Sequence, residues 1–92
     1  MSDIDRIRES IRQGQYDMTM HAMEEMAEDF LDIIDVENAV FTGQIVRTEK
    51  DDPRGTKYII EGFAKNGVTP VGVVGRFTAK ASYLVITIYA IT

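Results

Sequence analysis

Apolar side chains in the first 42 residues recur at helical intervals. Ile4, Ile7 and Ile11 follow the i, i+3, i+7 spacing of one helix face, and Gly14 supplies a stop signal. After an extended link at residues 15–19, the apolar positions again follow the helical period. The pattern predicts three helices: one between a cap at Ser2 or Asp3 and Gly14, one over Met20–Phe30, and one over Val36–Thr42 with Asp35 as its N-cap.

The second half changes to the period of two that is typical of strands. Turn-forming residues separate its segments, with Asp51–Gly55 in one connection and an Asn66-Gly67 pair in a tight hairpin. Four strands are predicted over Gln44–Glu49, Thr56–Ala64, Val68–Phe77 and Tyr83–Ile91. Consecutive strands with short connections favour an antiparallel meander. We therefore expect one α+β domain over residues 1–92, with N-terminal helices packed on one face of a four-stranded sheet.

Alternation along the last strand sorts its side chains into two faces. The entirely apolar set is expected to face the helices: Leu84, Ile86, Ile88 and Ala90. The opposite set is expected to face solvent or a ligand: Tyr83, Val85, Thr87, Tyr89 and Ile91. Tyrosines on a sheet face with cations nearby are typical of surfaces that bind single-stranded RNA. The cations nominated for RNA binding are Arg47, Arg54, Lys57 and Lys65.

The amino-acid composition excludes several classes of protein and of functional site. The 92 residues include no cysteine and one histidine, which excludes disulfide scaffolds, zinc fingers and thiol catalysis. A net charge of −5 argues against a protein that coats DNA. The charge is unevenly divided, because residues 1–42 hold eleven acids and three arginines, whereas residues 43–92 hold four acids and seven bases. An acidic N-terminus and the absence of a long apolar run predict a cytoplasmic protein that does not contact membranes.

Histidine is the side chain that exchanges protons most readily near neutral pH, and the chain has one, His21. Glu25 lies at i+4, where it can hydrogen-bond to the imidazole and fix its ring. Two interpretations stay open: a general acid or base for phosphodiester cleavage, and a surface histidine without a catalytic task. The acids that follow His21 match no EF-hand spacing, so we expect neither a metal nor another cofactor.

Met20, Met23 and Met26 lie on one face of the second predicted helix. Methionine fills irregular space in protein cores, and it also lines adaptable binding grooves. The core is the favoured interpretation, and a binding groove is the alternative.

Several short motifs occur in an order that resembles one family. The motifs are His21-Ala22 with Met26, Asp35–Val46, Asp51–Gly55, Gly62, Val73–Arg76 and Val85–Tyr89. Over residues 18–91 their order resembles a small bacterial and archaeal family of domains of unknown function, which is distantly similar to the RelE and BrnT ribonuclease toxins. The resemblance implies a RelE/BrnT-like α+β fold and a toxin of a type II toxin–antitoxin system.

The resemblance also implies an activity and partners. Relatives of this kind look like enzymes that cleave mRNA without a metal or cofactor, in some cases on the ribosome, and that pair with a small antitoxin bearing a zinc-finger region. Carried over by position, the implied catalytic residues are His21, Arg76, Thr87 and Tyr89. Arg76 would stabilise the charge of a pentacoordinate phosphate, and His21 or Tyr89 would move a proton.

The chain departs from the family pattern at three positions. Glu25 stands where many relatives carry arginine, Asp29 lies near the next basic position, and Gly72 replaces a frequent histidine. Two functions therefore stay open. The first is a toxin-like ribonuclease that contacts RNA or the ribosome. The second is a non-catalytic module that keeps the toxin-like fold and binds a partner or forms a homodimer through its sheet face or a strand edge.

Overall fold

The helices begin at side chains that cap their first turns. In the computed structural model, which describes residues 1–91, the N-caps are Ser2, Thr19 and Asp32. The Thr19 hydroxyl accepts a hydrogen bond from the Ala22 amide at 3.1 Å. Asp32 and Asp35 form a capping box, in which each side chain accepts from the other's amide. The helices are α1 (Asp3–Arg12), α2 (Met20–Glu28) and α3 (Ile33–Thr42).

Two helix bounds differ from the prediction. α3 starts at Ile33 rather than Val36, because Asp32 is its N-cap and Asp35 occupies the third helical position. α2 ends at Glu28 rather than Phe30, since Phe30 has a left-handed φ of 57°. The spacing of apolar residues marks neither the start of α3 nor the end of α2, because apolar residues lie on both sides of each boundary.

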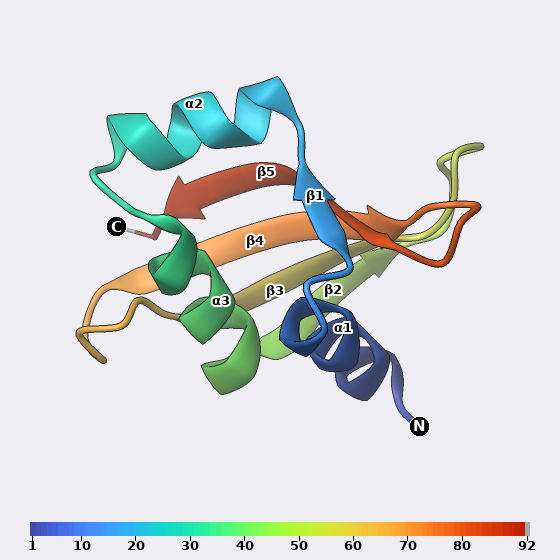
Figure 1. The fold of residues 1–92 in the computed structure, drawn as a ribbon, viewed down its shortest axis with the longest axis horizontal. Coiled ribbons are helices and arrows are strands. Elements are labelled where there is room, and N and C mark those ends of the chain that lie inside the picture. The colour runs from blue at the N-terminus through green and yellow to red at the C-terminus, as the bar shows by residue number, and fades with distance from the viewer. Residues whose placement is uncertain (92) are drawn as a thin grey trace.

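The sheet contains five strands, one more than predicted. They are β1 (Tyr16–Met18), β2 (Gln44–Glu49), β3 (Lys57–Phe63), β4 (Pro70–Phe77) and β5 (Tyr83–Ala90), in the order β1-β5-β4-β3-β2 (Figure 1). The predicted antiparallel meander of β2 to β5 is confirmed. The expected extended link instead contains β1, which pairs in parallel with β5, so the sheet is mixed. Three residues are too few for alternation to reveal a strand.

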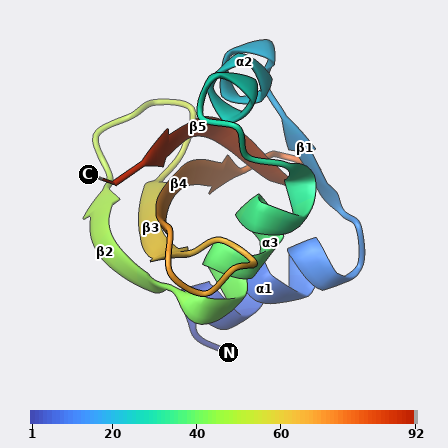
Figure 2. The same ribbon diagram turned by 90° about the vertical axis from the view of Figure 1, so that its left-hand side faces the viewer.

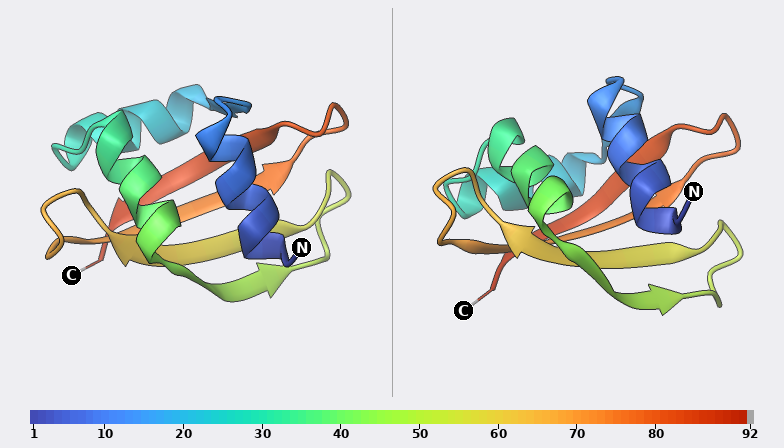
Figure 3. Two further views of the ribbon diagram at one scale, coloured as in Figure 1. Left: turned by 60° about the horizontal axis from the view of Figure 1, so that its bottom comes forward. Right: turned by 90° about the horizontal axis from the view of Figure 1, so that it is seen from below.

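The helices cover one face of the sheet, and the α+β class is confirmed. α3 packs against β3 and β4, and α2 packs against β5. Figure 3 shows α1 and α3 over the same face, and Figure 2 shows the sheet curving around them. The Arg8 guanidinium joins the two helices because it donates to the Val40 and Gly43 carbonyl oxygens at the end of α3. Within residues 1–91, none of the helices has the length and apolar character that a bilayer crossing requires.

Buried side chains of the helices and of the covered sheet face form the core. The main members are Ile7, Ile11, Val36, Val40, Tyr58, Ile60, Val71, Val73, Tyr83, Val85 and Ile88. Of the three methionines of α2, only Met26 packs against this core, whereas Met20 and Met23 are 71% and 45% exposed. The core interpretation of the methionine face is therefore wrong for Met20 and Met23, because α2 lies at the margin of the sheet.

A β-bulge reverses the side-chain alternation half-way along β5. The ladder between β4 and β5 shifts by one residue at Ile86, which has no partner on β4. Tyr83 and Val85 are therefore buried in the core before the bulge, and Ile88 is buried in it after the bulge. The predicted faces are wrong for Tyr83, Val85 and Leu84, because strict alternation breaks at Ile86. They are correct for the residues beyond it.

Within residues 1–91, the opposite face of the sheet carries no helix, and we call it the helix-free face. It consists of the strand residues that alternate with the core positions. They include Gln44, Arg47 and Glu49 on β2, Lys57, Ile59 and Glu61 on β3, Gly72, Val74 and Arg76 on β4, and Leu84, Thr87 and Tyr89 on β5. The face thus mixes charged, aromatic and aliphatic side chains.

Gly62 of β3 allows α3 to approach the sheet closely. A Cβ at this position would overlap the carbonyl oxygen of Ala39, which is backbone and cannot swing aside. We expect Gly62→Ala to lower the free energy of unfolding by about 3 kcal/mol in urea denaturation. Gly67→Ala is the control, because Gly67 has open space around it and only its φ of +76° resists the change, at about 1 kcal/mol. Equal losses in the two variants would contradict the close approach.

Candidate functional site

The outer edge of β5 is bonded by β1 along its first half and by side chains of α2 and its C-cap along its second half. β1 pairs with β5 only as far as Val85. Beyond that point the Ile88 amide donates to Glu25 Oε1 at 3.1 Å, and the Ala90 amide donates to Asp29 Oδ2 at 3.1 Å. Two carboxylates one helical turn apart thus satisfy two edge amides of β5, which closes this edge to other strands.

His21 is attached to the β5 edge through Glu25. Its Nε2 lies 3.2 Å from Glu25 Oε1, the same oxygen that accepts from the Ile88 amide. The expected i, i+4 contact is therefore confirmed. The imidazole is 67% exposed, so it is open to solvent while the carboxylate orients it beside β5. An oriented and accessible histidine can carry a proton to or from a bound molecule.

Thr87 and Tyr89 flank Ile88 along β5 and belong to the helix-free face. The Tyr89 ring lies across Gly72 of β4, in the space that a Cβ there would fill. Its hydroxyl donates to Glu61 Oε2 at 3.3 Å. Partial burial, together with the Glu61 carboxylate, raises the pKa of the Tyr89 hydroxyl above its ordinary value. The phenol therefore stays protonated near neutral pH, and its ring is held against the sheet.

Arg76 lies on the same face but further along β4. Tyr89 is opposite Gly72, and Arg76 is four residues beyond Gly72, or about 13 Å along a strand. Thr87 lies between these two positions, because its partner on β4 is Val74. Within residues 1–91, Arg76 forms no ion pair and no side-chain hydrogen bond. Tyr89, Thr87 and Arg76 thus form an elongated row rather than a cluster around one atom.

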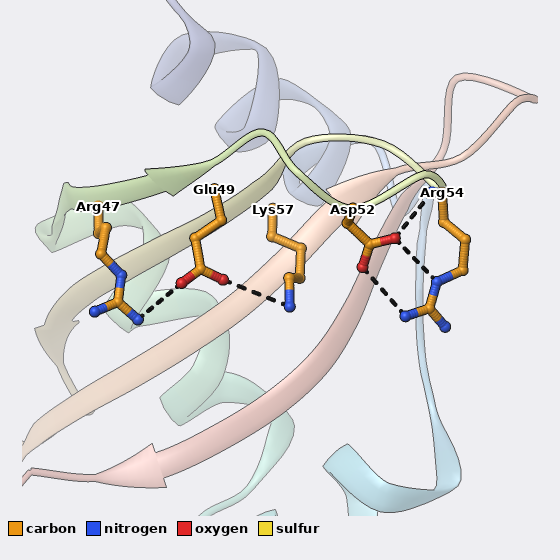
Figure 4. A network of polar contacts seen from close by, with 5 residues as sticks. All are labelled: Arg47, Glu49, Asp52, Arg54 and Lys57. Atoms are coloured by element: carbon orange, nitrogen blue, oxygen red, sulfur yellow. Dashed lines mark hydrogen bonds and ion pairs between the residues drawn. The ribbon is translucent and has the colours of Figure 1, made fainter.

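Three of the four cations nominated for RNA binding lie near one another (Figure 4). Arg47 and Lys57 both contact the Glu49 carboxylate, at 3.1 Å and 3.5 Å respectively. Arg54 lies in the loop between β2 and β3 and pairs with Asp52 at 3.1 Å. The hydrogen bonds from Arg54 lower the pKa of Asp52 to about 2. Each of these three cations therefore already has an anionic partner.

Lys65 lies apart from the other nominated cations. It follows β3 and forms an ion pair with Asp32, the N-cap of α3, at 2.9 Å. The structure therefore does not bring Lys65 to the helix-free face. The loop with Arg54, together with the end of β2, encloses an open hollow of about 920 Å³.

Most acids in and after α2 are engaged with backbone groups. Glu25 and Asp29 bond to β5, and Asp32 caps α3. Among residues 1–91, no three His, Asp or Glu side chains are grouped as metal ligands would be. The side chains of Glu24 and Glu28 form no ion pair or hydrogen bond within residues 1–91.

Sequence reasoning missed the roles of Glu25, Asp29 and Glu61. The first two are departures from the family pattern that place acids where relatives have bases, whereas the structure shows them bonded to the β5 edge. Their i, i+4 spacing was visible, but the strand amides that they meet lie more than 60 residues away. The contacts of Tyr89 with Gly72 and Glu61 depend on the strand ladder, which aligning the predicted hairpins would have revealed.

The chain matches a family described as a domain of unknown function, DUF4258, over residues 18–90. This chain belongs to the DUF4258 family. The matched range contains α2, α3 and the whole meander of β2 to β5, and so includes His21, Arg76, Thr87 and Tyr89. The resemblance to a family of small domains of unknown function is thereby confirmed. Comparisons of this DUF4258 domain with curated proteins and with solved structures gave no match.

The hydrogen bond between Tyr89 and Glu61 can be tested by titration. We expect Glu61→Gln to lower the pKa of Tyr89 toward the ordinary value of 10.0, because the phenolate then no longer forms beside a negative charge. The measurement is an NMR titration of the tyrosine ring carbons. Glu49→Gln is the matched control, since Glu49 lies on the same face but contacts Arg47 and Lys57 instead. An unchanged Tyr89 pKa in Glu61→Gln would refute the contact.

Proposed function

We propose that this DUF4258 domain is a toxin-like protein that acts on single-stranded RNA at its helix-free face. The proposal rests on one observation about β5. Thr87 and Tyr89 flank Ile88, whose amide holds the carboxylate that orients His21. An imidazole, an aromatic ring and two hydroxyl groups therefore border the same short stretch of strand.

Tyr89 and Arg76 are suited to holding RNA. An aromatic ring that lies on a sheet and is partly exposed offers a face on which a base can stack. Arg76 has no carboxylate partner within residues 1–91, so its charge is available to a phosphate. The row from Tyr89 through Thr87 to Arg76 would bind a base at one end and the backbone at the other.

RNA cleavage would require a proton carrier in addition to these RNA-binding residues. Attack of a ribose 2′-hydroxyl on the adjacent phosphorus forms a 2′,3′-cyclic phosphate and breaks the bond between phosphorus and the 5′-oxygen. His21 at the β5 edge is the candidate that accepts the proton of the 2′-hydroxyl, and the imidazolium so formed, or the Tyr89 hydroxyl, supplies a proton to the departing 5′-oxygen. Thr87 and Tyr89 lie beside that edge and Arg76 lies further along. In this proposal Arg76 therefore anchors the RNA strand rather than stabilising the reacting phosphate. A small antitoxin is the expected partner that restrains the activity.

Variants of the row test RNA binding. We expect Tyr89→Ala to weaken binding of a fluorescently labelled single-stranded RNA about tenfold, because a stacked base loses its platform. Tyr89→Phe keeps the ring and should bind nearly as wild type. Arg76→Ala should weaken binding several-fold and flatten its salt dependence, as measured by fluorescence anisotropy. Lys80→Ala is the matched control, since Lys80 is exposed in the connection between β4 and β5. Equal weakening by Lys80→Ala and Arg76→Ala would argue against the row.

Expression of the chain alone in a bacterium tests the toxin-like activity. We expect growth arrest and new RNA 5′ ends with the wild-type chain. His21→Ala should relieve the arrest, because it removes the group that carries the proton. The fold should be unaffected, since the His21 side chain is largely exposed. Circular dichroism of the purified variant provides the control for folding. Normal growth and intact RNA with the wild-type chain would rule out the ribonuclease.

A non-catalytic binding or oligomerisation module is the second candidate. The observation that favours it is charge pairing on the helix-free face, where Arg47 and Lys57 share Glu49. The outer edge of β2 pairs with no strand within residues 1–91, and Val46 on it is 53% exposed. Light scattering distinguishes the candidates: a stable dimer that binds no RNA favours the module, and a monomer that binds RNA excludes it.

A further inference from the structure

Glu61 is an acid on the helix-free face, where RNA is proposed to bind. It lies on β3 and is half-buried. Its Oε2 accepts a hydrogen bond from the Tyr89 hydroxyl at 3.3 Å. Within residues 1–91 its Oε1 accepts no hydrogen bond, and the carboxylate forms no ion pair. Because a carboxylate repels phosphate groups, binding of the RNA backbone alone leaves this acid without a role.

The strand register places Glu61 between an amide and an aromatic ring. Gln44 on β2 is opposite Glu61, and its side chain is exposed. Glu61 and Tyr89 are both opposite Gly72 on β4, from its two sides. Gly72 carries no Cβ, so the Tyr89 ring crosses β4 and its hydroxyl reaches the Glu61 carboxylate. The ring is therefore bordered by a carboxylate and, one strand further, by an amide.

Cations gather toward the other end of the same face. Lys57 on β3 and Arg76 on β4 are neighbours there, one residue beyond the last paired positions of the two strands. On β4, four residues separate Arg76 from the position of the Tyr89 ring, or about 13 Å. Arg47, which lies near Lys57 (Figure 4), is also close enough to Tyr89 to oppose the rise in the Tyr89 pKa that burial and Glu61 cause. The helix-free face thus has an aromatic end with an acid and a cationic end.

This distribution of charge suits a nucleotide better than a simple ion. An inorganic anion at the ring would be repelled by Glu61, and a cationic ligand would be repelled by Arg47. A nucleotide combines an anionic phosphate with an uncharged base whose edge carries N–H donors. Its phosphate can bind at the cationic end while its base lies at the ring.

We propose that Tyr89, Glu61 and Gln44 form a subsite that selects guanine among the bases of single-stranded RNA. The base stacks on the Tyr89 ring, and its N1–H and N2–H groups donate to the Glu61 carboxylate. Its O6 accepts from the Gln44 amide. This selection rests on the proposed RNA-directed function and names the RNA base that the helix-free face recognises.

The hydrogen-bonding edges of the bases explain the choice of guanine. A carboxylate only accepts hydrogen bonds, and its two oxygens together offer about four acceptor sites, so the bond from Tyr89 leaves room for others. Guanine presents two adjacent N–H donors followed by a carbonyl acceptor. Adenine and cytosine each present one amino group beside a ring nitrogen that repels a carboxylate. Uracil presents one N–H between two carbonyl oxygens, which repel it on both sides.

Fluorescence anisotropy with the full chain tests this selection. The probes are labelled oligouridines of roughly nine nucleotides, whose central nucleoside is guanosine, inosine, adenosine, cytidine or uridine. We expect the guanosine RNA to bind about tenfold more tightly than the uridine RNA. Inosine lacks only the N2 amino group of guanosine, so the inosine RNA should bind about threefold more weakly than the guanosine RNA.

Variants of the subsite separate base selection from folding. The amide of Glu61→Gln offers a single acceptor oxygen, so affinity for the guanosine RNA should fall about fivefold and inosine should bind as well as guanosine. Removal of a negative charge should raise affinity for the uridine RNA about twofold. A merely structural role of Glu61 would move both affinities in the same direction. Gln44→Ala should reduce the preference for guanosine about threefold, because O6 loses its donor.

Glu49→Gln is the matched control, since Glu49 is an acid of the same face that contacts Arg47 and Lys57 instead. It should strengthen binding of every RNA and leave the preference for guanosine unchanged. Equal affinity for the five RNAs, a preference for another base, or a guanosine preference that persists in Glu61→Gln overturns the guanine subsite but not RNA binding. Absence of binding to all five RNAs overturns the RNA-directed function together with the subsite.

Discussion

The hydrogen-bond requirement of the backbone amides along the outer edge of β5 determines how this DUF4258 domain is arranged. A strand edge carries amide groups that require partners, and β1 supplies partners along only part of β5. The Glu25 and Asp29 carboxylates bond to the Ile88 and Ala90 amides along the rest of the edge. α2 must therefore run along β5 rather than over the middle of the sheet. That placement orients His21 beside β5 and leaves Met20 and Met23 exposed.

The domain consequently has two unlike surfaces. The helix-free face carries cations and the Tyr89 ring, whereas residues 13–46, which include α2 and α3, contain eight acids and no lysine or arginine. Because helices and strands occupy different layers, most of the acids lie in the helical layer, to which α1 adds three arginines. We propose an RNA-directed function for the helix-free face.

Much of the fold follows from local patterns. The antiparallel meander and its strand ends, within two residues, agree with alternation and turn chemistry. β1 was missed because three residues show no usable period, and the start of α3 was misplaced because Asp32 and Asp35 are both plausible caps. In the candidate site, the outward positions of Thr87 and Tyr89 were predicted. Those of Tyr83 and Val85 were not, since a bulge at Ile86 reverses the alternation.

By itself, the amino-acid sequence determined the order of the three helices and of β2 to β5, the turn positions and the division of charge. These features depend on neighbours within a few residues, whose periodicity and backbone preferences are visible in the chain. Only the tertiary structure decided that Glu25 and Asp29 bond to β5, that Tyr89 lies across Gly72, and that Phe30 stays exposed. Such contacts, or their absence, depend on the register and packing of segments far apart in sequence, and no local pattern records that register.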